Sequence, residues 1–148
     1  VLHHTGDMWA ALKNVVPLVK EKGLLYISIY NHQPLFTPIW TAIKKLYNKS
    51  DKKGQNAIVW FCGTFEVCGL LVYDTLHLRN PFSRFKGNTR RRGMSIWHDF
   101  IDWYGGYPFE TATPAQIKTF FFENGYSLKR ESLVGNKRGC NEFVFIKN

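Results

Sequence analysis

The chain has 148 residues, of which 45% are hydrophobic and 21% charged, so it is long enough to bury a core and too apolar to be intrinsically disordered. Its three cysteines cannot all pair and lack zinc-ligand spacing, which predicts buried free thiols in a cytoplasmic protein. The net charge of +9 would attract polyanions, but the basic residues form short scattered clusters that are typical of a solvated surface.

The sequence predicts no membrane-spanning helix. It has neither the basic-then-apolar pattern of a secretion signal nor a run of eighteen uncharged apolar residues. The nearest approach, Ala57 to Tyr73, contains Glu66 and is shorter than a bilayer span requires. We therefore expect no transmembrane segment.

The first predicted elements are a helix and a buried strand. Thr5 or Asp7 can cap a helix that begins near Met8, and Pro17 should interrupt that helix. The strand Leu24–Tyr30 is apolar at nearly every position, which favours an interior strand, covered on both faces, in a mostly parallel sheet. The polar run that begins at the end of this strand, YNHQ, would then lie at the edge where open α/β sheets bind ligands.

Residues 34–92 depart from this alternation and predict an inserted helical cap. Pro38 suits the first turn of one helix, Lys49 to Gln55 reads as a polar flexible loop, and a second helix from Ala57 to His77 is apolar nearly all round. Such a helix is either fully covered or half of a partner interface. We expect the cap to shape a substrate pocket.

The segment GMSIWHDFIDWYGGYPFE, residues 93–110, is the densest in aromatic and acidic side chains. Its apolar residues have helical spacing, and Gly105 with Gly106 should end the helix. His98 and Asp102 are four residues apart, where a carboxylate can orient an imidazole. Two interpretations remain open: a core helix with a solvated face, on which His98 and Asp102 are an ordinary surface pair, or the wall of a ligand pocket.

The last elements are a capped helix and a hairpin. Thr113, Pro114 and Gln116 form a helix start that should continue to Gly125. Tyr126 to Val134 and Asn141 to Lys147 are predicted to pair as antiparallel strands.

The residues that begin the chain resemble a known family. VLHHTGDMWAALKNVVPLVKEKGLLYISIYN resembles the region from the end of the fourth strand to the fifth strand of class I S-adenosylmethionine-dependent methyltransferases. The segments GMSIWHDFIDWYGGYPFE, TPAQI and GCNEFVF are similar to one bacterial branch of that class. The resemblance covers essentially the whole chain but only the carboxyl-terminal half of the family's domain. It implies an α/β fold: a partial Rossmann-like sheet in one domain, 1–148, with the inserted cap at 34–92 and a closing antiparallel hairpin.

The resemblance also implies roles for individual residues. Leu2, His3 and His4 would line the methionine end of S-adenosylmethionine. The side chains that would face the methyl acceptor are Tyr30, Asn31, Tyr107 and Glu110, together with His98 as the catalytic base and Asp102 as its support. The family's glycine-rich cofactor loop has no counterpart, because none of the twelve glycines forms GxGxG. We therefore expect this chain alone to bind the cofactor weakly or not at all.

Two alternatives belong to other functional classes. The first is a non-catalytic module that self-associates through the helix Ala57 to His77 and an exposed sheet edge. The second is a nucleic-acid binder or RNA methyltransferase that uses Arg90 to Arg92 and the lysine-rich loop. The scattered charge favours a small-molecule acceptor over nucleic acid.

Overall fold

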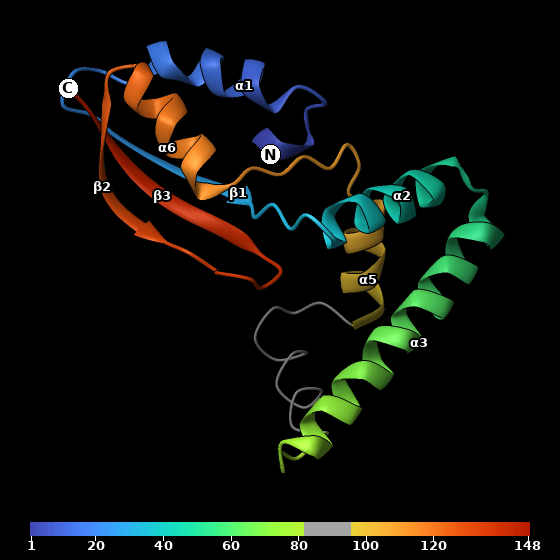
Figure 1. Ribbon diagram of the computed structural model, residues 1–148. Coiled ribbons are helices and arrows are strands. Elements are labelled where there is room, and N and C mark those ends of the chain that lie inside the picture. The colour runs from blue at the N-terminus through green and yellow to red at the C-terminus, as the bar shows by residue number, and fades with distance from the viewer. Residues whose placement is uncertain (82–95) are drawn as a thin grey trace. The chain divides into compact units, whose positions relative to one another are not determined.

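The computed structural model describes residues 1–81 and 96–148 (Figure 1). These residues form two compact units, one made of Val1–Thr41 and Pro108–Asn148 and the other of Ala42–Tyr107. In chain order the elements are a 3-10 helix Leu2–His4, α1 Met8–Val15, a 3-10 helix Val16–Leu18, β1 Leu24–Tyr30, α2 Phe36–Lys49, α3 Lys52–Leu76, α5 Ile96–Gly105, α6 Pro114–Glu123, β2 Tyr126–Ser132 and β3 Cys140–Lys147.

The first unit contains a three-stranded sheet in the order β1-β3-β2. Both β1 and β2 pair antiparallel with β3, with Ile27 opposite Phe143 and Glu131 opposite the same residue on the other side. The closing hairpin of β2 and β3 is therefore confirmed. The expectation of a mostly parallel sheet around β1 is wrong for the described residues, which form a mixed α/β fold with an antiparallel sheet.

The predicted interior position of β1 is also wrong for the described chain. β1 is an edge strand of this sheet, and Leu24 and Tyr26 are 56% and 60% exposed. Ile27 and Ile29 point to the opposite face and are buried. The sequence signal was misleading because Leu24 and Tyr26 are large and largely apolar, like the core residues Ile27 and Ile29, and only Ser28 interrupts the apolar run on the open face.

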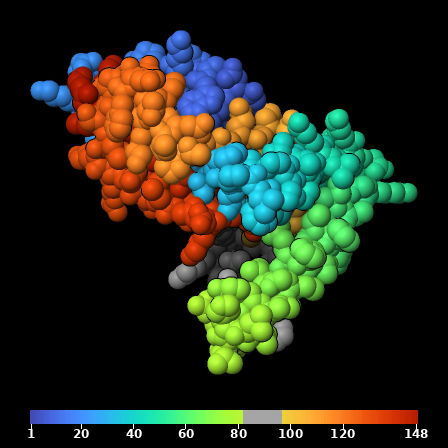
Figure 2. Space-filling view, in the orientation of Figure 1, coloured from blue at the N-terminus to red at the C-terminus, as the bar shows by residue number. Residues whose placement is uncertain are grey.

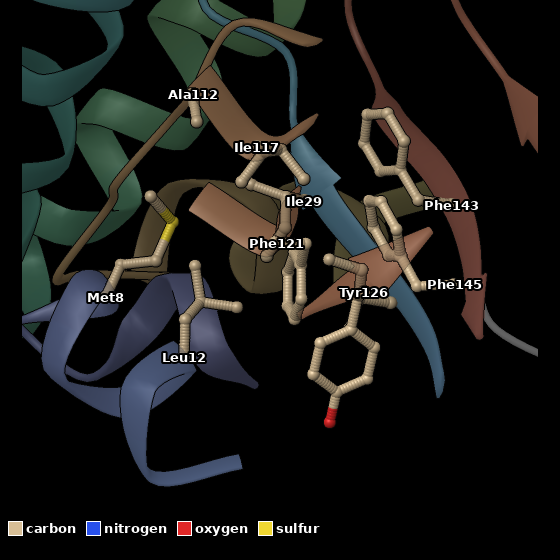
Figure 3. Close-up of a cluster of buried hydrophobic side chains, with 10 residues drawn as sticks. Met8, Leu12, Ile29, Ala112, Ile117, Phe121, Tyr126, Phe143 and Phe145 are labelled. Atoms are coloured by element: carbon tan, nitrogen blue, oxygen red, sulfur yellow. The ribbon is translucent and has the colours of Figure 1, made fainter. Parts of the chain in front are cut away.

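The core lies between that covered face and two helices. Figure 1 shows α1 and α6 on the same side of the sheet, and Figure 3 shows their side chains meeting those of the strands. The rings of Phe121 and Phe145 stack with their centroids 4.5 Å apart, and the Tyr126 hydroxyl donates to the Val16 carbonyl at 2.8 Å. The full cluster is Met8, Leu12, Ile27, Ile29, Ala112, Ile117, Phe121, Tyr126, Phe143 and Phe145.

The helix boundaries of this unit follow the predicted signals. Asp7 caps α1 by accepting a hydrogen bond from the Ala10 N–H, and the α-helical bonding ends at Val15, two residues before Pro17. Thr113 and Gln116 form a capping box at the start of α6, with each side chain bonded to the other's backbone N–H. After α6, Gly125 adopts a φ of +81°, a conformation that glycine reaches without strain.

The second unit contains the rest of α2 together with α3 and α5. The expected flexible loop Lys49 to Gln55 is wrong, because only Ser50 and Asp51 separate α2 from α3. Asp51 accepts a hydrogen bond from the Gly54 N–H, so this polar segment is a helix start. The predicted helix Ala57 to His77 exists, and α3 extends it at its amino end to Lys52.

The helix α5 packs against the middle of α3. A Cβ at Gly63 would lie 3.1 Å from the Phe100 ring, so glycine permits this close approach. The Tyr104 hydroxyl donates to a Glu66 carboxylate oxygen at 2.8 Å, and the rings of Trp60 and Trp97 lie 5.3 Å apart. The helix ends at Gly105, as predicted.

Some predictions fall outside the described residues or are only partly tested. Met94 and the arginines Arg90 to Arg92 lie outside the described ranges. The insertion 34–92 stays a prediction, of which the structure shows α2 and α3. The cysteines Cys62, Cys68 and Cys140 are free, as expected, but Cys68 is exposed and the other two are half-buried, so their predicted burial is wrong.

Candidate functional site

The first unit brings the histidine pair next to the end of β1. The 3-10 helix Leu2–His4 places the His3 ring 4.3 Å from the Tyr30 ring and the His4 ring 5.7 Å from it, measured between centroids. The Phe109 ring lies 5.1 Å from Tyr30. Three predicted site residues, His3, His4 and Tyr30, therefore form one aromatic cluster at the carboxyl end of β1.

His3 is the most buried member of this cluster. It is 7% exposed, and its Nδ1 atom has no hydrogen-bond partner among the described residues. Burial, reinforced by the neighbouring His4 imidazole, lowers the pKa of His3 from 6.5 to about 4, although a hydrogen bond to the backbone of Ser28 acts in the opposite direction. His3 is consequently neutral at physiological pH and packs as an aromatic side chain.

The segment 108–112 holds the 3-10 helix Leu2–His4 in place by hydrogen bonds. The His4 Nδ1 atom lies 2.6 Å from the Pro108 carbonyl oxygen, and the Glu110 N–H donates to the His3 carbonyl at 3.1 Å. The Ala112 N–H then donates to Tyr30, forming a short parallel bridge at the edge of β1. Residues more than seventy positions apart in sequence are thus locked around the histidines.

Glu110 makes contacts that sequence reasoning did not foresee. One carboxylate oxygen accepts the Gly6 N–H at 3.0 Å, and the other accepts the Met8 N–H at 2.9 Å. A negative charge at this position also complements the partial positive charge at the start of α1. The carboxylate therefore anchors the turn that carries the histidines, while its predicted contact with an acceptor stays a prediction.

A pocket of about 460 Å³ opens beside the carboxyl end of β1. Its lining contains no acidic residue and no lysine or arginine, so its polar groups are amides and one imidazole. Such a lining suits a neutral ligand with hydrogen-bonding groups and an apolar portion. The lining residues are Asn31, His32, Gln33, Pro34, Leu35, Phe36, Pro114, Leu133, Gly135, Asn136 and Asn141.

The amides at the pocket's base hold its shape. Asn31 donates from Nδ2 to the Gly135 carbonyl at 2.7 Å and accepts from Asn141 Nδ2 at 2.9 Å. Asn141 in turn accepts the Val134 N–H at 3.0 Å. Asn31 was predicted to contact the acceptor, but its side chain is committed to the hairpin turn. It lines the pocket and positions the opposite wall.

His32 and Gln33 are two pocket residues that keep polar side-chain atoms available to a ligand. His32 Nδ1 pairs with the Thr111 hydroxyl at 2.9 Å, which leaves Nε2 without a hydrogen bond in the described part of the chain. Gln33 donates to the Asn136 carbonyl at 2.7 Å and retains its amide oxygen. Of this segment, the predicted site included only Tyr30 and Asn31, and the signal that extends it is the polar run that continues through His32 and Gln33.

The remaining predicted residues belong to the second unit. His98 and Asp102 are both exposed on α5. Tyr107 is exposed, with the Lys45 ammonium 6.0 Å from its ring centroid. The predicted pairing of His98 and Asp102 as base and support, and their role in catalysis, stay predictions.

The cofactor-facing residues are accessible to different degrees. Leu2 and His4 are half-buried and retain exposed surface, whereas His3 is enclosed. The predicted contact of these residues with the cofactor stays a prediction. Within residues 1–81 and 96–148, no three His, Cys, Asp or Glu side chains are grouped to hold a metal ion.

Comparison with known proteins yields no match: no family model, no curated protein and no solved structure is similar to this chain.

Proposed function

We propose that this chain is the acceptor-side part of an S-adenosylmethionine-dependent methyltransferase. The observation that carries the proposal is the joining of the His3–His4 turn to Tyr30 at the carboxyl end of β1, beside a neutral pocket. The pocket opens at the end of β1 next to these groups, and its amides, imidazole and apolar side chains suit a neutral acceptor. The edge position of β1 and the antiparallel pairing of the sheet are the observations that weigh against it.

The chemistry demands little of the protein. S-adenosylmethionine supplies an already activated methyl group, so the residues around it need mainly to position the acceptor and remove one proton at most. Leu2 and His4 would contact the cofactor, and His3 would support them from behind. His32 Nε2 and the Gln33 amide oxygen would orient a neutral acceptor in the pocket.

Calorimetric titration of S-adenosylmethionine into the full-length protein tests this proposal. We expect binding, and the variant His4→Ala should bind about fivefold more weakly, the effect of losing about 1 kcal/mol of contact energy. His77→Ala is the matched control, since His77 is exposed at the end of α3 in the other unit, and it should leave the affinity unchanged. Absence of binding heat in the unmodified protein would refute the enzymatic proposal.

A further inference from the structure

The helix α3 exposes an apolar stripe that the described residues of its own unit leave open. Phe61, Phe65, Val72 and Leu76 recur at intervals of four, seven and four residues, which places them on one helical face. They are 78%, 78%, 58% and 76% exposed. The stripe extends over about 22 Å at 1.5 Å per residue. Figure 2 shows the green atoms of this helix at the molecular surface.

The stripe carries no charge. Between Lys53 and His77 the only charged residues are Glu66 and Asp74, of which Asp74 lies opposite the stripe and Glu66 on the side that contacts α5. Glu66 accepts the hydrogen bond from Tyr104 of α5, and Asp74 is 1% exposed. The most apolar eighteen-residue window of α3 has a mean hydropathy of 1.5, with 11% of it buried. An uncharged apolar surface of this extent is uncommon on a soluble monomer.

Basic residues flank the stripe at both ends. Lys49, Lys52 and Lys53 are exposed at the amino end of α3, and Arg79 is exposed just beyond its carboxyl end. This arrangement fits an anionic surface that extends past the helix at both ends. It fits a second copy of the chain poorly, because pairing two stripes in either direction brings basic ends together.

The contacts of α3 with α5 argue for a helix that lies in the membrane surface. At 25 residues α3 is about 37 Å long, so its length alone would allow it to span a bilayer. However, α5 packs against the middle of α3 and carries His98 and Asp102 on exposed positions. A spanning α3 would bring these polar side chains to the depth of the hydrocarbon, where they are costly. Lying flat, α3 immerses only the stripe.

We propose that the stripe Phe61, Phe65, Val72 and Leu76 docks this protein onto an anionic lipid membrane. The apolar side chains enter the boundary between headgroups and acyl chains, and the lysines at the amino end of α3 contact lipid phosphates. This proposal is independent of methyl transfer. Every residue it uses belongs to Ala42–Tyr107, and none belongs to the His3 cluster.

Flotation with lipid vesicles tests the proposal directly. The probes are vesicles of phosphatidylcholine alone and vesicles in which phosphatidylserine replaces about a third of it. We expect the chain to float with the anionic vesicles, and the double variant Phe61→Asp with Phe65→Asp to lose about a hundredfold or more in affinity. Leu18→Asp is the control, because Leu18 is 79% exposed in the other unit, and it should bind normally.

A second variant separates the electrostatic from the apolar contribution. Lys52→Gln with Lys53→Gln should weaken binding to anionic vesicles about 25-fold, at about fivefold per lysine, and leave the weak binding to neutral vesicles unchanged. Circular dichroism of each variant verifies that the helices remain folded. Alkaline carbonate should release the bound protein.

Three outcomes would overturn the proposal. The first is a lack of flotation with either vesicle, and the second is flotation that the aspartate variants leave intact. The third is retention after carbonate treatment, which would mean that α3 spans the bilayer. Sedimentation equilibrium identifies the competing explanation: a dimer that the aspartate variants dissociate, without vesicle binding, would assign the stripe to a second copy of the chain.

Discussion

Lowering the pH should destabilise the first unit through His3. This imidazole is enclosed by Tyr30 and His4, and burial lowers its pKa from 6.5 to about 4. In the unfolded chain the same group titrates near its ordinary value. Between these two pH values the unfolded state therefore binds more protons than the folded state, so stability rises with pH across this range.

The size of the effect follows from the two pKa values. A fall from 6.5 to about 4 corresponds to about 3 kcal/mol at 1.36 kcal/mol for each tenfold change in proton affinity. This stability is fully present above pH 6.5 and is lost as the pH falls through about 4. It is a large share of the roughly 5–15 kcal/mol that is typical of a folded domain, about a fifth to three fifths.

Urea unfolding of the chain and of His3→Phe at a series of pH values measures this contribution. Phenylalanine preserves an aromatic ring beside Tyr30 and does not titrate, so the variant should lose most of the pH dependence in this range. An NMR titration of the His3 ring provides a direct second reading. A measured pKa near 6.5, or equal pH dependence in the two proteins, would refute the burial argument.

Two further substitutions test individual contacts, each against a matched control. Glu110→Gln removes the charge that accepts two backbone N–H groups at the start of α1, so urea unfolding should show a loss of about 1–2 kcal/mol in the free energy of unfolding. The control Glu123→Gln, at an exposed position on α6, should change this free energy little. Equal effects of the two substitutions would contradict the anchoring role of Glu110. Gly69→Ala should stabilise α3 by up to about 1 kcal/mol, because alanine favours a helix more than glycine does and the new methyl group meets no other atom. Gly63→Ala should stabilise the helix less, or destabilise it, because its methyl group would press on the Phe100 ring. Thermal unfolding of the two variants measures the difference.

Local signals in the sequence predicted the elements well. The capping box at Thr113 and Gln116, the interruption at Pro17 and the helix end at Gly105 each depend on residues close in sequence, and all three are present in the structure. The hairpin was likewise visible in the alternation of NEFVFIK and the turn before it. Local hydrogen bonding determines these features, so the order of residues is sufficient to predict them.

Features that depend on distant partners were harder to predict. Whether Leu24 and Tyr26 are covered depends on which elements pack on each face of β1, and an apolar strand sequence does not contain that information. The Lys49 to Gln55 segment is polar enough for a loop, yet Asp51 can also cap a helix, and the latter is what forms. Glu110 appeared to be a pocket carboxylate because its partners, the N–H groups of Gly6 and Met8, lie more than a hundred residues earlier.

The edge of β1 explains why the histidine turn is ordered where it is. In an antiparallel pair, alternate residues direct their backbone groups to the partner strand, and the others direct theirs outward. The backbone of Asn31 bonds to Gly139 on the β3 side, while the backbones of Tyr30 and His32 bond outward to Ala112. The backbone groups of the even-numbered residues therefore face the open edge.

Ser28 belongs to this outward-facing set, and its backbone forms a hydrogen bond with the His3 ring. The end of the edge nearest the pocket is therefore satisfied by the turn and the Ala112 segment, which couples the position of the histidines to β1 itself. The position of His4 is consequently coupled to the sheet's own hydrogen bonding.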